Sequence, residues 1–261
     1  MKYEFKITKG GFFNTLKLIN KDKKSLFYVV LMDVIFLIAL FILAQIFNII
    51  SQGALARQQI YQLLFLAVFY YLAALFIYSL FKYIILNFVK SVFENNKITF
   101  NRLGKFYLLN IIVFLILFLI FFILSLLAAS VVEGIAPFVS IIILLLYTVI
   151  AYAFVNISHV LFIEGKNLIQ SLQMAAKSLI KFNKYYGVYL VILASFVIVF
   201  LVFTLFGNAL RGTFFQDYNS ILQYGDIYTI VFIHTIGIIF YIAILFNRFY
   251  FYNIVREKLM K

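Results

Sequence analysis

Six long apolar runs, separated by shorter polar segments, dominate the pattern of hydrophobic and polar positions along this chain. Each run reaches the ~20 residues that a helix needs to cross a hydrocarbon layer of ~30 Å. None alternates strictly like a barrel strand, and a backbone in lipid must satisfy its own hydrogen bonds. The pattern predicts an all-α, polytopic membrane helix bundle of six transmembrane helices, at residues 26–50, 60–81, 106–129, 137–163, 185–206 and 227–251.

The basic residues predict how these spans are oriented. The N-terminal segment, the connections after the second and fourth spans, and the C-terminal end hold seven, five, four and four of the 22 Lys and Arg residues. The connections on the opposite side hold only Arg57 and Arg211. Basic residues favour the cytoplasmic side, so both termini are expected in the cytoplasm. We expect a single integral membrane domain, residues 1–261, in the cell membrane.

One cytoplasmic connection has the periodicity of a helix lying in the membrane interface. Apolar side chains stand at positions 168, 169, 172, 175, 176, 179 and 180, and polar side chains at positions 170, 173, 177 and 181. This stripe predicts an amphipathic interfacial helix over residues 168–182, with Gly165 ending the preceding helix and Asn167 as N-cap. The lysines expected to contact lipid headgroups at this interface are Lys17, Lys177, Lys181 and Lys184.

A similar stripe occurs near the N-terminus, over residues 12–19. Residues 12–18 and 168–174 share one pattern of polarity, and each segment precedes a pair of spans. The alignment predicts a repeated unit, made of an interfacial helix followed by a transmembrane hairpin.

Composition removes several classes of function. The formal net charge is +13, and the chain has no cysteine, which excludes disulfides and thiolate chemistry. No zinc-protease, nucleophile-elbow or phosphate-loop motif occurs. We therefore expect no enzymatic activity, no cofactor, no metal and no nucleic-acid partner. The basic charge predicts membrane lipids as partners, with anionic headgroups on the cytoplasmic side, and a membrane protein is a further expected partner.

Polar side chains inside the spans are costly and are candidates for function. Those near the cytoplasmic face form a candidate inner-leaflet polar site: Asp33, Lys82, Asn156, His159 and Arg248. Asp33, about 10 Å into the first span, is interpreted in three ways. It forms a structural ion pair with Arg248 or Lys82, it binds a proton or substrate, or it extends toward water. His159 is expected either to bond to Asn156, three residues earlier, or to serve a function.

Two features belong to the other face of the predicted bundle. Residues 207–226 form the longest external connection, which either rests on the outer interface or gates or binds a ligand. His234 lies in the leaflet opposite His159, so the two histidines are not expected to share a metal.

Part of the sequence resembles a known group of membrane proteins. The relevant segments are Phe162-Ile163-Glu164-Gly165, the basic amphipathic stretch over residues 171–179, residues 181–184, and the opening residues 31–36. They resemble uncharacterised six-span bacterial and archaeal integral membrane proteins, which are similar to the membrane domain attached to some glycerophosphodiester phosphodiesterases. The soluble phosphodiesterase domain has no counterpart here, so the resemblance implies a membrane module and no phosphodiesterase activity.

These observations lead to three functional hypotheses. The first is a non-enzymatic membrane module, either an accessory subunit or a lipid-contacting scaffold. The second is a small transporter or permease subunit that uses the inner-leaflet polar site. An intramembrane lipid enzyme is the third.

Overall fold

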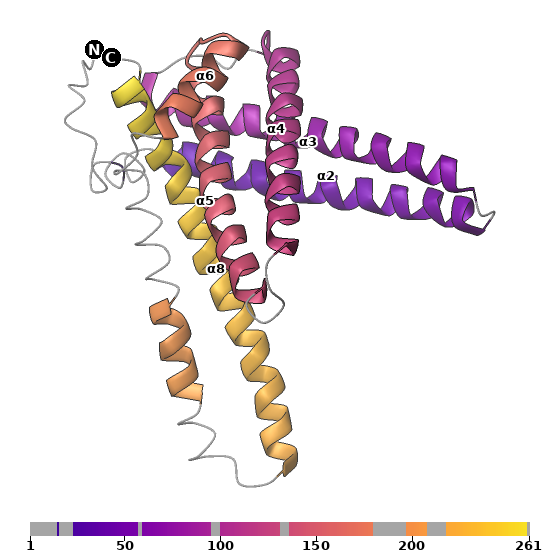
Figure 1. Ribbon diagram of the computed structural model, residues 1–261. Helices are drawn as coiled ribbons and strands as arrows, with labels where there is room; N and C mark the ends of the chain where they lie inside the picture. The colour runs from indigo at the N-terminus through magenta and orange to yellow at the C-terminus, as the bar shows by residue number, and fades with distance from the viewer. Residues whose placement is uncertain are drawn as a thin grey trace. The chain divides into compact units, whose positions relative to one another are not determined.

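The computed structural model describes residue 15 and residues 23–56, 59–94, 100–130, 136–179, 197–207 and 218–259. Within this part of the chain the regular secondary structure is helical throughout (Figure 1). The labelled helices are α2 (Lys23–Ala56), α3 (Ile60–Glu94), α4 (Leu103–Ala129), α5 (Ala136–Ile163), α6 (Leu168–Leu179) and α8 (Tyr218–Leu259). A further apolar helix covers Val197–Gly207.

Five helices among the described residues are long and apolar enough to cross a membrane. These segments are Lys23–Gly53, Ile60–Phe93, Leu103–Ala129, Val139–Ile163 and Ile227–Glu257. The protein is thus a multi-pass helical membrane protein, and five predicted spans coincide with these helices. Most of the predicted fifth span lies outside the described residues, and its described end forms the short helix Val197–Gly207.

The chain divides into two compact units, and each is described by itself. The first unit comprises residues 1–180 and 252–261, and the second comprises residues 181–251. A single membrane domain stays a prediction.

In the first unit, α2 and α3 form an antiparallel hairpin (Figure 1). Aromatic pairs bridge the two helices, with ring centroids 4.5–6.4 Å apart: Tyr28 with Phe88, Phe36 with Tyr78 and with Phe81, and Phe47 with Tyr70. The residue numbers on α3 decrease as those on α2 increase, so these pairs define the register of the antiparallel hairpin. Such ring pairs contribute beyond the apolar area they bury.

Tyrosine hydroxyls tie neighbouring helices of this unit together. Tyr107 on α4 donates to the carbonyl of Leu72 on α3 at 3.1 Å, and Tyr147 on α5 donates to the carbonyl of Leu117 on α4 at 3.0 Å. Each helical carbonyl already accepts one backbone bond and has a second lone pair for the hydroxyl. These bonds add polar contacts to helix pairs that otherwise meet through apolar side chains.

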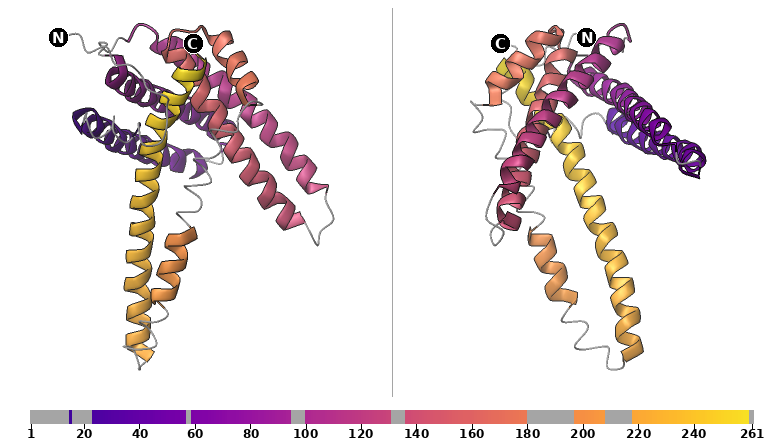
Figure 2. Two further views of the ribbon diagram at one scale, coloured as in Figure 1. Left: turned by 90° about the vertical axis from the view of Figure 1, so that its left-hand side faces the viewer. Right: turned by 45° about the vertical axis from the view of Figure 1, so that its right-hand side comes forward.

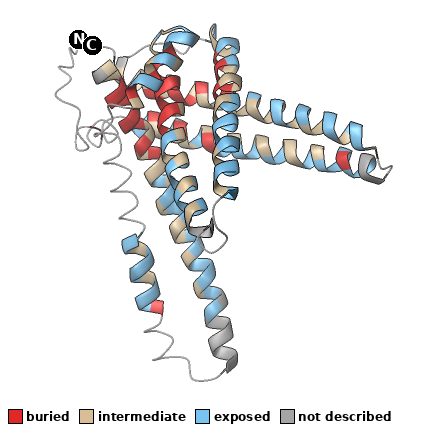
Figure 3. Cartoon of the chain, viewed as in Figure 1, coloured by how far each residue is buried: buried red, intermediate tan, exposed pale blue. Residues whose placement is uncertain are grey.

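The core of the first unit lies at the C-terminal end of α5. All residues from 156 to 163 are buried, and Figure 3 shows the buried positions gathered in this region. Phe106 of α4 is fully buried there and contacts the ring of Phe162 at 5.6 Å. Much of α2, of α4 and of the N-terminal half of α3 is exposed and apolar, the surface expected of helices that face lipid.

The predicted helix after α5 is present as α6, and its N-cap is confirmed. The Asn167 side chain accepts a hydrogen bond from the backbone N–H of Gln170 at 2.8 Å, and the Gln170 side chain accepts from the backbone N–H of Asn167 at 3.4 Å. This reciprocal pair is a capping box, which satisfies two N–H groups that the first turn leaves without helical partners. Residues 180–182, the predicted end of this helix, lie outside the described residues.

The face of α6 that packs against the rest of the first unit consists of small residues. Its buried residues are Ser171, Ala175 and Ser178, whereas Ile169 is 64% exposed and Ala176 is exposed too. Small side chains let α6 approach its neighbours closely, so steric fit rather than hydrophobicity alone selects the contact face. An interfacial position for α6 stays a prediction. The N-terminal stripe lies outside the described residues, apart from Thr15, and the repeat also stays a prediction.

In the second unit, the helix Val197–Gly207 lies beside the first half of α8 (Figure 2). Phe203 contacts Phe232 at 5.4 Å and Tyr228 at 6.1 Å, and the Tyr228 hydroxyl donates to the Phe203 carbonyl. The expectation of a loop throughout residues 207–226 is wrong in its second half, because α8 already begins at Tyr218. The polar residues of this half stand on the first turns of a helix, and residues 208–217 lie outside the described residues.

Candidate functional site

The end of α5 is a sharply defined turn. Gly165 adopts a φ of 102°, which a residue with a side chain rarely does. The N–H of Lys166 donates to the carbonyl of Leu161 and the N–H of Gly165 to that of Phe162, each at 3.1 Å. This pair of bonds is a Schellman motif, and it confirms the predicted helix end at Gly165.

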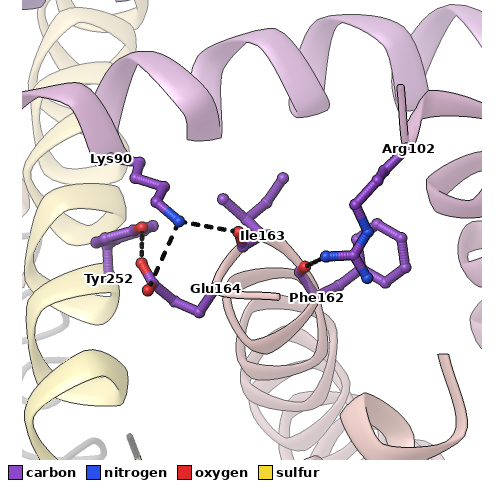
Figure 4. Close-up of polar contacts among 6 residues, drawn as sticks. All are labelled: Lys90, Arg102, Phe162, Ile163, Glu164 and Tyr252. Carbon is purple, nitrogen blue, oxygen red and sulfur yellow. Dashed lines mark hydrogen bonds and ion pairs between the residues drawn. The ribbon is translucent and has the colours of Figure 1, made fainter. Parts of the chain in front are cut away.

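Arg102 binds the same helix end from the start of α4 (Figure 4). Its guanidinium donates to the carbonyl of Phe162 at 2.9 Å and to that of Lys166 at 2.6 Å. The guanidinium carbon also lies 4.2 Å from the centroid of the Phe162 ring. A positive charge here stabilises the negative end of the α5 dipole, and the guanidinium adds a second donor to the Phe162 carbonyl, which also accepts from the N–H of Gly165.

Lys90 and Tyr252 complete this arrangement, which we call the α5 clamp: Lys90, Arg102, Glu164 and Tyr252. The Lys90 ammonium donates to the Ile163 carbonyl at 3.2 Å and lies 3.8 Å from a carboxylate oxygen of Glu164. The hydroxyl of Tyr252, on α8, donates to the other carboxylate oxygen (Figure 4). Since Tyr252 is fully buried, its hydroxyl needs such a partner.

Aromatic contacts hold Tyr252 in the clamp. Its ring stacks on Phe93 of α3, with centroids 5.4 Å apart and planes at 17°. The guanidinium carbon of Arg256, one helical turn later, lies 5.9 Å from the same Phe93 ring. The last turns of α8 are therefore fixed against the C-terminal part of α3 as well as against the end of α5.

Sequence analysis did not identify the α5 clamp. It counted Lys90 and Arg102 only among the basic residues that predict the topology, and it named Glu164 only within the segment that carries the family resemblance. A signal was present, because Glu164 is an acidic residue directly after an apolar span, where a carboxylate needs a cation or hydrogen-bond donors. Tyr252 lies 88 residues from Glu164, and Arg102 lies 60 residues from Phe162, so no local pattern along the chain identifies these partners.

A second polar group lies deeper along α5, and we call it the Lys82 cluster: Lys82, Asn156 and His159. The Lys82 ammonium on α3 donates to the side-chain oxygen of Asn156 at 3.1 Å. The Asn156 side-chain N–H donates to the carbonyl of Tyr152 at 2.8 Å, within its own helix. The structure thus brings together two residues of the predicted inner-leaflet site.

His159 is fully buried, one turn from Asn156 on the same helix. Its ring lies 4.9 Å from Phe106 and 6.3 Å from Tyr78, measured between centroids. Neither ring nitrogen has a hydrogen-bond partner among the described residues, so the expected bond to Asn156 is wrong. Asn156 instead accepts from the charged donor Lys82, and charge-assisted bonds are the stronger kind.

Asp33 is also buried, with 6% of its surface exposed. On α2 it lies between Tyr28, which stacks on Phe88, and Phe36, which contacts Phe81. The antiparallel register therefore places Asp33 level with Lys82 along the hairpin. This position favours Lys82 over more distant cations of α3 as its neighbour.

The structure does not relate the remaining predicted residues to this group. Arg248 belongs to the second unit, so its pairing with Asp33 stays a prediction. His234 is exposed on α8, and its Nδ1 lies 2.7 Å from the carbonyl of Ile230 in the same helix. Lys177 is exposed in the last turn of α6. The other predicted lipid contacts, Lys17, Lys181 and Lys184, lie outside the described residues.

Comparisons with protein-family models, curated proteins and solved structures found no match to this chain. The fold and contacts define a class, a multi-pass helical membrane protein. The resemblance to the membrane domain of glycerophosphodiester phosphodiesterases stays a prediction from the sequence segments that suggested it.

Proposed function

We propose that this protein is a non-enzymatic membrane module that acts as an accessory subunit or a lipid-contacting scaffold. The observation that carries the proposal is the α5 clamp, in which charged side chains bind backbone carbonyls and one another. Arg102 uses two guanidinium nitrogens on two carbonyls, and Lys90 lies between the Ile163 carbonyl and Glu164. Groups engaged in this way stabilise a helix end and join helices, which is a framework role.

The exposed surface of the helices supports a role in contacts. On α4, Phe118, Leu119 and Phe122 are 53%, 58% and 53% exposed. A soluble monomer rarely exposes large continuous apolar surface, whereas a membrane module offers it to lipid tails or to the helices of a partner. The proposal assigns this surface to such contacts.

The proposal includes the finer topology. It places six spans in the cell membrane, with a fifth span over residues 185–206, amphipathic segments at the interface, and both termini in the cytoplasm. Its support is the uneven distribution of basic residues, of which only Arg57 and Arg211 fall on the proposed outer side. Lys177 and the other interfacial lysines then face the anionic headgroups of the inner leaflet.

The experiment that tests the proposal is affinity purification of the tagged chain in a mild detergent, with mass spectrometry of the proteins and lipids that co-purify. A stoichiometric membrane-protein partner, or consistent retention of anionic lipid, is the expected result. An unrelated multi-pass protein with the same tag serves as the control. Transport of a solute, or turnover of a lipid, by proteoliposomes that contain this chain alone would overturn the proposal.

A second candidate function is that of a small transporter or permease subunit, and one observation favours it. His159 is fully buried and its ring nitrogens have no hydrogen-bond partner among the described residues. Buried polar groups without partners are rare and are often associated with function. Under this hypothesis, Asp33→Asn abolishes transport in a folded protein. Unchanged transport would exclude Asp33 from the site.

A further inference from the structure

An apolar cavity of about 380 Å³ lies between α4, α5 and α6 of the first unit. All three helices contribute side chains to its wall, which presents apolar atoms: Ile116, Ile120, Ile150, Phe154, Leu172 and Ala176. Ile120 and Ile150 are 43% and 47% exposed, so the cavity opens toward the surroundings of the helices. Its volume falls in the range of small-molecule sites, which begins at ~300 Å³.

The cavity lies at the depth of the membrane. Ile150 stands thirteen residues before Ile163, the last residue of α5, which corresponds to about 20 Å along the helix. The candidate span Val139–Ile163 includes this position. An apolar cavity does not hold water, and at this depth the molecules that surround it are lipid tails. Hydrocarbon is thus the chemistry that fits the wall.

A cationic residue follows the cavity wall along α6. Gln173 contributes to the lining, and Lys177 follows it on α6 by four residues. Residues at this spacing share a helix face, so the exposed Lys177, which is not itself part of the cavity wall, follows Gln173 on the same side of α6. A long flexible lysine stem extends along apolar surface and presents its charge at the polar boundary. Apolar wall and cation together match a lipid that has an anionic headgroup.

We propose that this cavity binds one acyl chain of an anionic phospholipid, whose phosphate contacts Lys177. The inference rests on the proposed lipid-contacting function and deepens it, because it assigns one lipid to one position. The formal net charge of +13 favours an anionic over a zwitterionic headgroup. The segment that follows α6 in the chain is the competing occupant, and the experiment separates the two.

The test measures the binding of phosphatidylglycerol to the detergent-solubilised full chain by native mass spectrometry. Phosphatidylcholine with the same acyl chains is the comparison lipid. Ala176→Trp fills the cavity, and Ala176→Leu is a milder version that keeps the chain folded if the indole does not fit. The matched control is Ile169→Trp, on the same helix, because Ile169 is 64% exposed and is not part of the cavity wall.

We expect the wild-type chain to hold one phosphatidylglycerol at least tenfold more tightly than phosphatidylcholine. Ala176→Trp lowers this affinity at least tenfold and Ala176→Leu lowers it less, whereas the affinity of Ile169→Trp stays within twofold of wild type. Lys177→Gln reduces the affinity for phosphatidylglycerol about fivefold and leaves phosphatidylcholine unchanged, since a single surface charge is worth about 1 kcal/mol.

Equal binding of phosphatidylglycerol by wild type and a folded Ala176→Trp protein would overturn the site. If wild type still preferred phosphatidylglycerol, the lipid would be held elsewhere and the proposed lipid-contacting function would stand. Absence of any preference in wild type would count against both. Unchanged lipid binding by a folded Ala176→Trp protein also overturns the site when its thermal stability falls, because the lipid is then not what the indole displaces.

Discussion

Arg102 contacts Phe162 in two ways at once. Its guanidinium donates a hydrogen bond to the Phe162 backbone carbonyl at 2.9 Å, and the guanidinium carbon lies 4.2 Å from the centroid of the Phe162 ring. A second bond from the same guanidinium reaches Lys166, beyond the turn at Gly165. One side chain from α4 therefore holds both sides of the connection between α5 and α6.

Replacement of Arg102 by alanine is expected to destabilise the protein by about 3 kcal/mol. Two charge-assisted hydrogen bonds and one cation–π contact disappear, and the carbonyls of Phe162 and Lys166 each lose one donor. Arg102→Lys restores less than half of the loss, because a single ammonium does not match the spacing of both carbonyls. The free energy of unfolding is measured by titrating the detergent-solubilised protein with SDS.

Lys105→Ala is the control for this prediction, since Lys105 is exposed on the first turn of α4. Its effect is expected within about 0.5 kcal/mol of zero. Equal stabilities for Arg102→Ala and Lys105→Ala would show that the clamp does not hold the end of α5.

Tyr252→Phe is expected to cost about 1 kcal/mol. The change removes the hydroxyl that donates to Glu164 and keeps the ring that stacks on Phe93. In a Glu164→Gln background the same change costs less, because the two residues share one interaction and their effects are not additive. Tyr61→Phe, at a position 88% exposed, gives the baseline. Additive effects in the double variant would argue against a direct bond.

His159→Leu is expected to leave stability unchanged or to raise it by about 1 kcal/mol. Removal of a buried polar group that has no partner in the described structure relieves a desolvation cost. Asn156→Leu is the contrasting variant, with an expected loss of about 2 kcal/mol, since it takes away the acceptor of Lys82. Thermal unfolding of both variants in nanodiscs provides the comparison. A loss above about 2 kcal/mol in His159→Leu would mean that the imidazole has an essential partner.

Gly165→Ala and Gly104→Ala are expected to act in opposite directions. Gly165 has a φ of 102°, so a side chain there introduces strain of about 1 kcal/mol. Gly104 lies in the first turn of α4 with open space where a Cβ would stand, and alanine favours the helix by up to about 1 kcal/mol. The unfolding midpoints of both variants are compared with that of the wild type. Stabilisation by both changes would contradict the turn geometry at Gly165.

Local patterns in the sequence predicted the local features correctly. Uniformly apolar runs admit only helices in a membrane, so most spans were predictable from composition alone. The turn from Gly165 to Asn167 was predictable too, because a glycine after a helix and an asparagine before the next one act within a few residues. Each of these features depends on neighbours along the chain.

Features that depend on distant residues were missed or mispredicted. Asn156 and His159 have the right helical spacing for a bond, but Lys82 from another helix takes the acceptor. On α6, the residues that pack against the rest of the first unit are Ser171, Ala175 and Ser178, and the apolar periodicity of the sequence does not identify this small-residue face. These contacts depend on which helices are neighbours in space, and a single sequence does not predict that arrangement.

The bond between Tyr252 and Glu164 has a consequence for the order of synthesis. A ribosome completes Glu164 long before it reaches Tyr252, which is 88 residues later. During that interval the carboxylate has Lys90 as its cationic neighbour but lacks the buried hydroxyl. The earlier helices of the first unit are therefore synthesised before the last turns of α8 that complete its contacts. The α5 clamp can form in full only after α8 has been synthesised.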